Sequence, residues 1–272
     1  MEFLGLVILG IFAGVLSGLL GLGGGVILVP GLMAFFIFKH FPSQVLMQFA
    51  TGTTLTAMIF TTGMATWAQN KYKNVRWPLL KILLPGLLIG AACGALLLRY
   101  ISTNHLRYGF VFLVSILGIR MLVGIEMIFN ADNEAIKMRS HSRIVVFMLT
   151  GIIGVLASLL GIGGGVLLIP FLMWLGLPMV QATSTSIASV FPTITLGAIG
   201  AMFVGWHSHQ ALPPLTVGYV YWPGALLIGV GSVCGVPAGA YLANHLPTRI
   251  IKRIFGGVLL IAAWQMLPKW PL

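Results

Sequence analysis

The sequence predicts an all-α polytopic membrane protein made of two inverted repeats of about five hydrophobic segments each, with glycine-broken helices in the first part of each repeat. Three observations predict this fold. The 272 residues are 58% hydrophobic and only 7% charged, with a mean hydropathy of +1.04, which is too apolar for a soluble surface. The apolar runs are about 20 residues long, enough to span a bilayer as a helix. An unusual glycine phrase also occurs twice.

The chain divides into a first transmembrane repeat (1–129), a polar linker (130–143) and a second transmembrane repeat (144–272). Continuous apolar runs favour helices, because a spanning segment must satisfy its own backbone hydrogen bonds. The predicted segments are 3–20, 26–38, 44–68, 77–98 and 106–129, then 144–160, 166–177, 179–205, 215–243 and 250–267.

The first segment of each repeat ends in the glycine phrase. Residues 14–33 read GVLSGLLGLGGGVILVPGLM and residues 154–173 read GVLASLLGIGGGVLLIPFLM, so 14 of 20 positions are identical at an offset of 140. Glycine lets the backbone leave the helix and approach a ligand closely. Two such breaks at equivalent places in two halves indicate the binding site of a transporter.

The second segment of each repeat is short and contains a proline, Pro30 or Pro170. A run of 12 or 13 residues is below the length that crosses a bilayer squarely. It is therefore predicted to be a half-helix or a re-entrant limb that begins at the glycines, and the sequence leaves open whether it spans. Broken backbone at that depth should face the protein interior.

Later segments repeat as well. ATGTTL at 50–55 matches ATSTSI at 182–187 with an offset of 132, and a Trp-Pro followed by glycines four residues apart occurs in both fourth segments with an offset of 145. Glycines at that spacing are typical of closely packed membrane helices. The shifts in offset correspond to insertions and deletions in loops.

The basic residues predict the orientation of the repeats. If all five segments of each half cross the membrane or return consistently, ten Lys and Arg residues lie on one side and four on the other. The positive-inside rule favours such an unequal distribution. An odd number of crossings per half makes the repeats inverted. The larger group is Lys71, Lys73, Arg76, Lys81, Lys137, Arg139, Arg143, Arg249, Lys252 and Arg253, and the smaller is Lys39, Arg99, Arg107 and Lys269.

The half-helices that begin near Val26 and Val166 would direct free N–H groups and positive dipole ends at one place, which favours an anion. Hydroxyl groups near the start of each third segment, and two flanking glutamines, supply further hydrogen-bonding groups. Tight helix packing is the alternative role of the glycines, and bonding to the helix's own backbone is the alternative role of the hydroxyls. The predicted substrate-binding residues are Gly23, Gly24, Gly25, Gly163, Gly164, Gly165, Thr51, Thr53, Thr54, Thr183, Ser184, Thr185, Gln48 and Gln181. Substitution of Gly24 or Gly164 by valine is expected to block backbone approach and to strain the backbone if φ is positive there.

Arg120 is added to this set because it lies within an apolar run, and an intramembrane arginine indicates function by default. The alternatives are that it reaches the interface or pairs with Glu126. No acidic residue lies mid-segment, so an Asp or Glu proton relay has no residues to use. Uniport, anion exchange or protonation of the substrate is expected instead.

Other classes of function are not favoured. The net charge of +11 is spread over short loops and forms no stripe for nucleic acid. His207 and His209 have no nearby acid or cysteine for a metal site, no cofactor motif occurs, and no histidine lies mid-segment beside Ser17 or Ser158 to make an enzyme. Cys93 and Cys234 are interpreted as small buried residues that form no disulfide.

The doubled glycine phrase, the A-T-[GS]-T-[ST] stretch and the later G-x-x-x-G helix resemble the sulfite exporter TauE/SafE family, also called the toluenesulfonate uptake permease family. The resemblance covers nearly the whole chain and departs at Ser158, where the first repeat has Gly18. It implies a multi-pass permease of the cell (inner) membrane that moves sulfur-containing anions such as sulfite or organosulfonates.

The predicted function is therefore a secondary transporter that holds a small anion at the paired glycine breaks. An anion channel, or a membrane subunit of a larger transport complex, is the alternative. The expected partners are the anionic substrate and the lipid bilayer, with no nucleic acid and a homodimer left open. The residues alone do not choose between sulfite, sulfonate, carboxylate and phosphate, nor the direction of transport.

Overall fold

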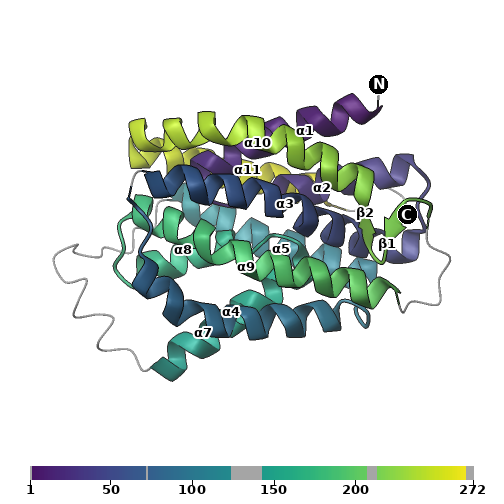
Figure 1. The fold of residues 1–272 in the computed structure, drawn as a ribbon, viewed down its shortest axis with the longest axis horizontal. Helices are drawn as coiled ribbons and strands as arrows, with labels where there is room; N and C mark the ends of the chain where they lie inside the picture. Colours follow the sequence, from purple (N-terminus) through teal and green to yellow (C-terminus); the bar gives the residue numbers. More distant parts are fainter. Residues whose placement is uncertain (1, 72, 124–142, 207–212, 268–272) are drawn as a thin grey trace.

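The computed structural model describes residues 2–71, 73–123, 143–206 and 213–267 of the chain. The helices run side by side as one bundle, with a two-stranded hairpin at one end (Figure 1). The helices of the first repeat are α1 (Glu2–Leu20), α2 (Gly25–Phe38), the short η1 (Ser43–Val45), α3 (Leu46–Lys71), α4 (Trp77–Leu97) and α5 (Thr103–Val123). Those of the second are α7 (Arg143–Leu160), α8 (Gly165–Trp174), α9 (Met179–Trp206), α10 (Trp222–His245) and α11 (Thr248–Gln265).

The helical fold predicted from the sequence is confirmed, and the described helices follow the predicted segments with one error before α10. The segment predicted to begin at residue 215 starts with the hairpin strands β1 (Thr216–Val217) and β2 (Val220–Tyr221), which pair antiparallel. Leu215 and Gly218 have φ of 64° and 56°, values that no α-helix contains. Residues 124–142 lie outside the described residues; they hold the end of the fifth predicted segment, with Glu126, and all of the predicted linker except Arg143, which begins α7. His207 and His209 also lie outside the described residues.

Helices pair across the two repeats through glycine faces. α1 packs along α10, and the equivalent helices α7 and α4 pack in the same way. Cβ atoms on Gly231, Gly235 and Gly239 of α10 would collide with backbone atoms of α1, and Cβ atoms on Gly86, Gly90 and Gly94 of α4 would collide with backbone atoms of α7. Only glycine permits this backbone approach. The repeated glycines therefore join one half of the chain to the other.

The helices at the centre of the bundle also pack across the two repeats. α3 and α9 pack against each other, α10 packs on α3, and α4 packs on α9. α5 and α11 form a further pair across the repeats, held in part by Arg107, whose Nε and Nη2 donate to the carbonyl oxygens of Met266 and Leu267 at 2.7 and 2.8 Å. α2 lies against α3, and α8 lies against α9.

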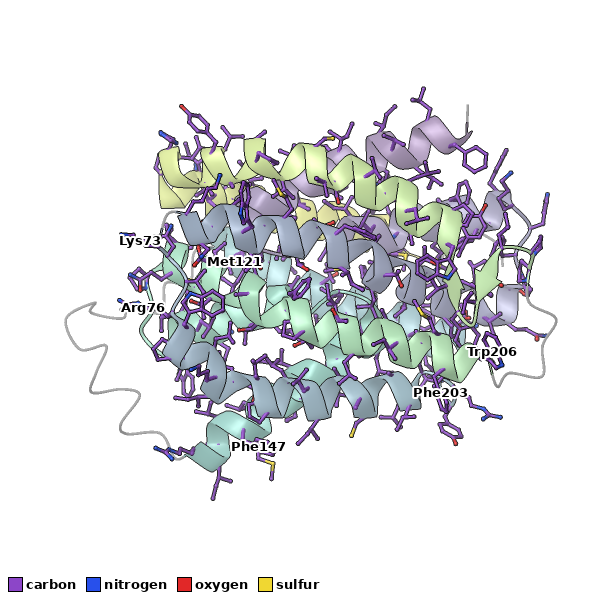
Figure 2. The ribbon with its side chains drawn as sticks, viewed as in Figure 1. Lys73, Arg76, Met121, Phe147, Phe203 and Trp206 are labelled. Atoms are coloured by element: carbon purple, nitrogen blue, oxygen red, sulfur yellow. The ribbon has the colours of Figure 1, made fainter. Side chains whose placement is uncertain are left out.

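Equivalent helices end at opposite ends of the bundle. Lys73 and Arg76, which follow α3, lie at one end, whereas Phe203 and Trp206 at the end of α9 lie at the other (Figure 2). These positions favour inverted repeats. The orientation of the two repeats in a membrane stays a prediction.

The protein is a multi-pass protein of the cell membrane. In the described part of the chain, six helices are long and apolar enough to cross a bilayer: α1, α4, α5, α7, α9 and α10. α2 and α8 have 14 and 10 residues, or about 21 and 15 Å at 1.5 Å per residue, which is too short to cross alone. The expectation that Cys93 and Cys234 are buried is wrong, because both are exposed on the bundle surface.

The cross-repeat contacts predict a sharp difference between two glycines of α1. A Cβ on Gly14 would collide with the backbone of Ser232 in α10, whereas a Cβ on Gly5 meets nothing within 4 Å. Overpacking of this kind costs about 1–3 kcal/mol. We expect Gly14→Ala to lower the melting temperature of the purified protein. Gly5→Ala is the control and should leave that temperature unchanged or raise it, and equal effects would contradict the assigned pairing.

The inverted arrangement predicts opposite accessibility for two loops. In a background with Cys93→Ala and Cys234→Ala, single cysteines are placed at Lys73 and at Leu215, both of which are exposed. An impermeant maleimide applied to intact cells should label only one position, and the other should react after permeabilisation. Labelling of both positions from the same side would favour parallel repeats.

Candidate functional site

Two backbone breaks, Gly21–Gly25 and Gly161–Gly165, separate α1 from α2 and α7 from α8. Gly24 and Gly164 are the N-caps of the short helices and are left-handed, with φ of 89° and 80°. Gly21, Gly23, Gly161 and Gly163 also have positive φ, between 69° and 79°. Side chains rarely tolerate this conformation, so the repeated glycines are required by backbone geometry. All residues of both breaks are buried.

Each break leaves backbone donors at a buried helix N-terminus. The carbonyl oxygen of Gly24 accepts from the N–H groups of Ile27 and Leu28, both at 3.1 Å, and the carbonyl of Gly164 is used in the same way. Within the described residues, the N–H groups of Gly25 and Val26 have no backbone partner, and neither N-cap carries a side-chain cap. Buried donors without partners are costly, and they mark a place where a ligand can bind.

The two breaks are packed against each other. A Cβ on Gly165 would lie 2.7 Å from the carbonyl oxygen of Gly21, and a Cβ on Gly25 would collide with the carbonyl oxygen of Gly161. These are equivalent contacts, made once in each direction. The N-termini of α2 and α8 therefore meet in one buried region between the repeats.

Each break also meets the third segment of the other repeat. A Cβ on Gly161 would lie 3.0 Å from Cα and 3.3 Å from Cβ of Thr51 on α3, and a Cβ on Gly21 would collide with the side chain of Thr183 on α9. Thr51 and Thr183 are equivalent at the offset of 132 found in the sequence. The structure thus brings the predicted glycines and these two predicted threonines together.

Several buried hydroxyl groups near this region have no hydrogen-bond partner. Thr51 and Thr54 of α3 and Ser186 of α9 are fully buried, and their oxygens are unpaired. Thr54 and Ser186 are repeat equivalents, and Thr51 contacts Gly161. A buried unpaired hydroxyl costs about 1–3 kcal/mol, so these groups reduce stability in the state described. Ser17 and Ser158 near the ends of α1 and α7 are unpaired too.

Thr53 and Thr185 have a structural role that the sequence did not indicate. The hydroxyl of Thr53 accepts from the N–H of Tyr221 at 3.0 Å, and that of Thr185 accepts from the N–H of Arg76 at 3.1 Å. Tyr221 and Arg76 directly precede the Trp-Pro starts of α10 and α4. Each threonine therefore fixes the entry of a helix from the other repeat.

The glutamines and Ser184 are also engaged. Gln48 donates to the carbonyl of Ile101 at 2.9 Å and accepts from Thr103 at 3.0 Å, so both ends of its amide hold α3 to the start of α5. Gln181 accepts from Nε of Arg76 at 2.9 Å. The Ser184 hydroxyl lies 3.2 Å from Oε1 of Gln69 and 2.8 Å from the carbonyl of Val180.

Arg120 lies apart from this group. It is in the last turn of α5 and its side chain is exposed on the bundle surface. The structure therefore does not bring it to the glycine breaks. The burial of a side chain within an apolar run depends on which face of the helix carries it, and the sequence around Arg120 does not fix that face.

The structure also changes the expected effect of valine at the caps. A Cβ on Gly24 points at Ala13 of α1, 3.4 Å away, and a Cβ on Gly164 points at Ala157 of α7, 3.1 Å away. Side chains there would press on the preceding helix and strain the backbone, and would not enter the space between the breaks. The expected direct block of backbone approach is therefore not supported at these two positions.

The two ends of the bundle are closed by different chemistry at equivalent positions. Phe49 and Tyr221 belong to an aromatic cluster with Phe36 and Phe41, in which the Phe41 ring centroid lies 5.2 Å from Phe49 and 5.8 Å from Tyr221. Their repeat equivalents are Gln181 and Arg76, which hydrogen-bond to each other. One end is therefore apolar, and the other is polar and basic, with Lys71 3.6 Å from the ring centroid of Trp67.

A cavity of about 390 Å³ lies elsewhere, between α2, α5 and α11. Pro30, Ile37, Arg107 and Trp264 are among its lining residues. None of the glycines of the two breaks lines it. This cavity is separate from the candidate site.

Comparison with known proteins covers nearly the whole chain. The model of the family described as sulfite exporter TauE/SafE matches residues 6–266. The probable membrane transporter protein YunE of Bacillus subtilis is 29% identical and a probable membrane transporter protein of Haemophilus influenzae is 28% identical. The matched regions cover 98% of this chain and 98% of YunE, and 96% of this chain and 97% of the second relative. No solved structure matches the chain.

The two helix-entry hydrogen bonds predict matched losses of stability. Thr53→Val and Thr185→Val keep the shape of the side chain but leave the N–H of Tyr221 or Arg76 without its acceptor, at a cost of about 1–3 kcal/mol. Both variants should lower the melting temperature. Thr51→Val removes an unpaired hydroxyl and should not, so a comparable loss at Thr51 would contradict the assigned hydrogen bonding.

Proposed function

Since the chain belongs to the sulfite exporter TauE/SafE family of membrane transporters, we propose that it is a secondary transporter of small sulfur-containing oxyanions. The anion is held between the N-termini of α2 and α8. Backbone N–H groups at Gly25, Val26 and their equivalents provide the main contacts, and Thr51 and Thr183 provide hydroxyls. Sulfite and small organosulfonates are the proposed substrates.

The observation that carries this proposal is the pair of buried helix N-termini with unpartnered donors. Oriented N–H groups and the positive end of a helix dipole favour an anion. An unpaired hydroxyl beside them adds a donor that can turn towards an oxyanion. Among the described residues, the one buried charged side chain is Arg107, which lines the separate cavity, so the N–H groups and helix dipoles provide the positive potential at the breaks.

The preference for sulfur comes from the family and not from the geometry. Sulfite, sulfonate, carboxylate and phosphate oxygens all accept hydrogen bonds from backbone N–H groups. The names of the two relatives say only that they are probable membrane transporters. A panel of anions is therefore required to identify the substrate class.

The packing around the breaks supports a transporter over an open channel. Buried apolar side chains surround the two helix N-termini, and an aromatic cluster closes one end of the bundle. A channel would require a continuous polar pore. An enzymatic role is not proposed either, because the described histidines, His40, His105 and His245, lie at or just beyond helix ends, and the hydroxyls of Ser17 and Ser158 have no hydrogen-bond partner.

The coupling mechanism follows from the scarcity of acidic residues. The helices of the bundle carry one acidic residue within their described bounds, Glu2 at the start of α1. An Asp or Glu proton relay at mid-helix is therefore not proposed. Uniport, anion exchange or co-movement of a proton on the substrate remains for this site.

Thermal stabilisation of the purified protein by anions tests the proposal. A ligand at a hundredfold excess over its dissociation constant stabilises the folded state by about 2.7 kcal/mol. We expect sulfite or a small sulfonate to raise the melting temperature more than acetate, phosphate or chloride at equal ionic strength. Thr51→Val should weaken the binding of this anion about tenfold or more, because a hydrogen bond to a charged group contributes about 1.5–3 kcal/mol.

Thr56→Val is the matched control. Thr56 is a buried threonine of the same helix, and its hydroxyl is already paired with the carbonyl of Gly52 at 2.9 Å. This variant should bind the anion as the wild type does. An absence of response to every anion, or equal responses in the Thr51→Val and wild-type proteins, would contradict the proposed site.

A further inference from the structure

Met58 of α3 occupies the point where the two glycine breaks face each other. A Cβ on Gly23 would collide with the terminal methyl group of Met58, and so would a Cβ on Gly163, which would also lie 3.3 Å from the Met58 sulfur. Gly23 and Gly163 are equivalent positions of the two repeats. One side chain, fully buried, therefore contacts the same place in both halves of the site.

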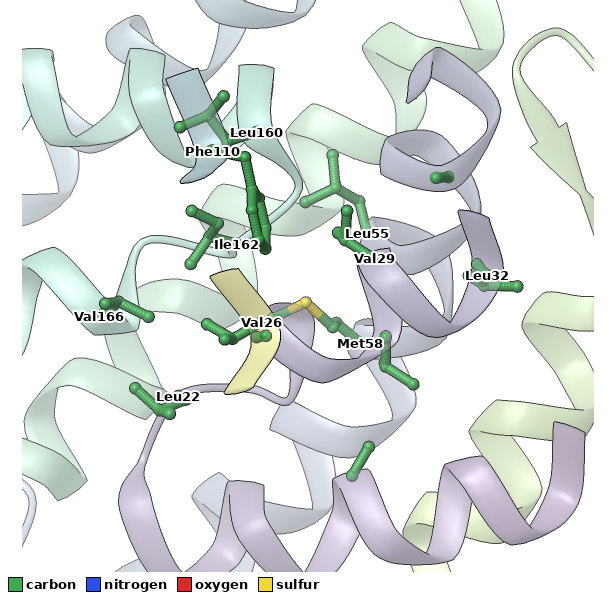
Figure 3. Packing of buried hydrophobic residues seen from close by; sticks show 14 of the residues in the cluster. Leu22, Val26, Val29, Leu32, Leu55, Met58, Phe110, Leu160, Ile162 and Val166 are labelled. Atoms are coloured by element: carbon green, nitrogen blue, oxygen red, sulfur yellow. The ribbon is translucent and has the colours of Figure 1, made fainter. Parts of the chain in front are cut away.

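The side chains around Met58 are closely packed and mostly apolar, and Thr62 of the same helix places its methyl group 3.0 Å from the Cβ position of Gly23. Figure 3 shows Met58 among Val26, Val29 and Leu55, which belong to the same buried cluster. From α9, Ile194 lies 3.4 Å from the Cβ position of Gly163 and Val190 lies 3.8 Å from that of Gly23. An anion held between the two breaks must displace the Met58 thioether, because these neighbours surround that side chain.

Met58 is not repeated in the second half of the chain. The equivalent of Met58 at the offset of 132 is Val190, a shorter and branched side chain. Methionine has an unbranched chain with three rotatable bonds and adapts to irregular space, whereas valine is stiff. The long movable side chain is thus supplied by α3 alone, at a site that is otherwise nearly symmetric.

We propose that Met58 sets the size of the anion that fits between the two breaks. The inference rests on the proposed function, since it assigns a role to Met58 only if an anion occupies this region. Small oxyanions fit when the thioether rotates aside, and anions with a bulky apolar group are rejected because the space beside Leu55 and Val190 is filled. Met58 is a selectivity residue and not a source of binding energy.

Uptake into vesicles containing the purified protein tests this role. Sulfite and benzenesulfonate are compared for the wild type, Met58→Val and Met58→Leu. Truncation to valine should raise the ratio of benzenesulfonate to sulfite uptake about tenfold, the scale on which small changes of apolar volume discriminate substrates. Met58→Leu keeps most of the volume and should retain the wild-type ratio.

Met47→Val is the matched control. Met47 is a fully buried methionine of the same helix, and its atoms are not among those nearest to the Cβ positions of the break glycines. A general loosening of the bundle would change the ratio in this variant too, and that result would overturn the assignment. An unchanged ratio in folded Met58→Val protein that still takes up sulfite would overturn it as well.

Failure of the proposed function gives a different result. Wild-type vesicles that take up no anion of the pair above protein-free vesicles would remove the transport proposal, and the role of Met58 with it. Should Met58→Val fold poorly, binding of benzenesulfonate to Met58→Leu and to the double variant Met58→Leu with Val190→Ala is measured by thermal shift. Stronger binding to the double variant supports a steric limit at this point, and equal binding contradicts it.

Discussion

The close approach of helix backbones across the two repeats is the constraint on which the rest of the structure depends. α1 is fitted to α10 and α7 to α4 by glycines that no other residue can replace without a collision. Neither half of the chain contains both members of such a pair. The interior is therefore built from helices of both halves, and the two glycine breaks lie against each other within it. The site is a product of the joining of the halves.

Equivalent positions of the two repeats are alike in some places and different in others, and the two kinds of position have different roles. The paired hydrogen bonds of Thr53 and Thr185 occur in both halves and fix the starts of α10 and α4. The equivalents Phe49 and Gln181, or Met58 and Val190, differ in size and polarity. Positions that repeat hold the framework, whereas positions that differ distinguish the two ends and the centre of the bundle.

Much of the fold was predictable because its signals are local. Length and apolarity give the helices, and a proline and glycine run mark the breaks at residues 21–25 and 161–165. The hairpin at 216–221 was missed because its residues are as apolar as those of a helix, and only the positive φ of Leu215 and Gly218 reveals the turn.

Of the predicted site residues, the structure brings together the glycines, Thr51 and Thr183. Gln48, Thr53 and Thr185 instead hold neighbouring helices, which depends on long-range partners that a sequence does not display. Met58 carried no signal, since a methionine in an apolar helix is unremarkable until its neighbours are known.

The packing of helices across the two halves resembles an isologous interface, but it lies within one chain. Gly235 of α10 meets the carbonyl of Ile11, and the equivalent Gly90 of α4 meets the carbonyl of Gly151, so each contact is made twice with the roles reversed. Two separate copies of a half-length chain would pair through such a surface with identical residues on both sides. When the two halves belong to one chain, their sequences can differ. A substitution then alters one side only, and a symmetric framework can acquire a direction.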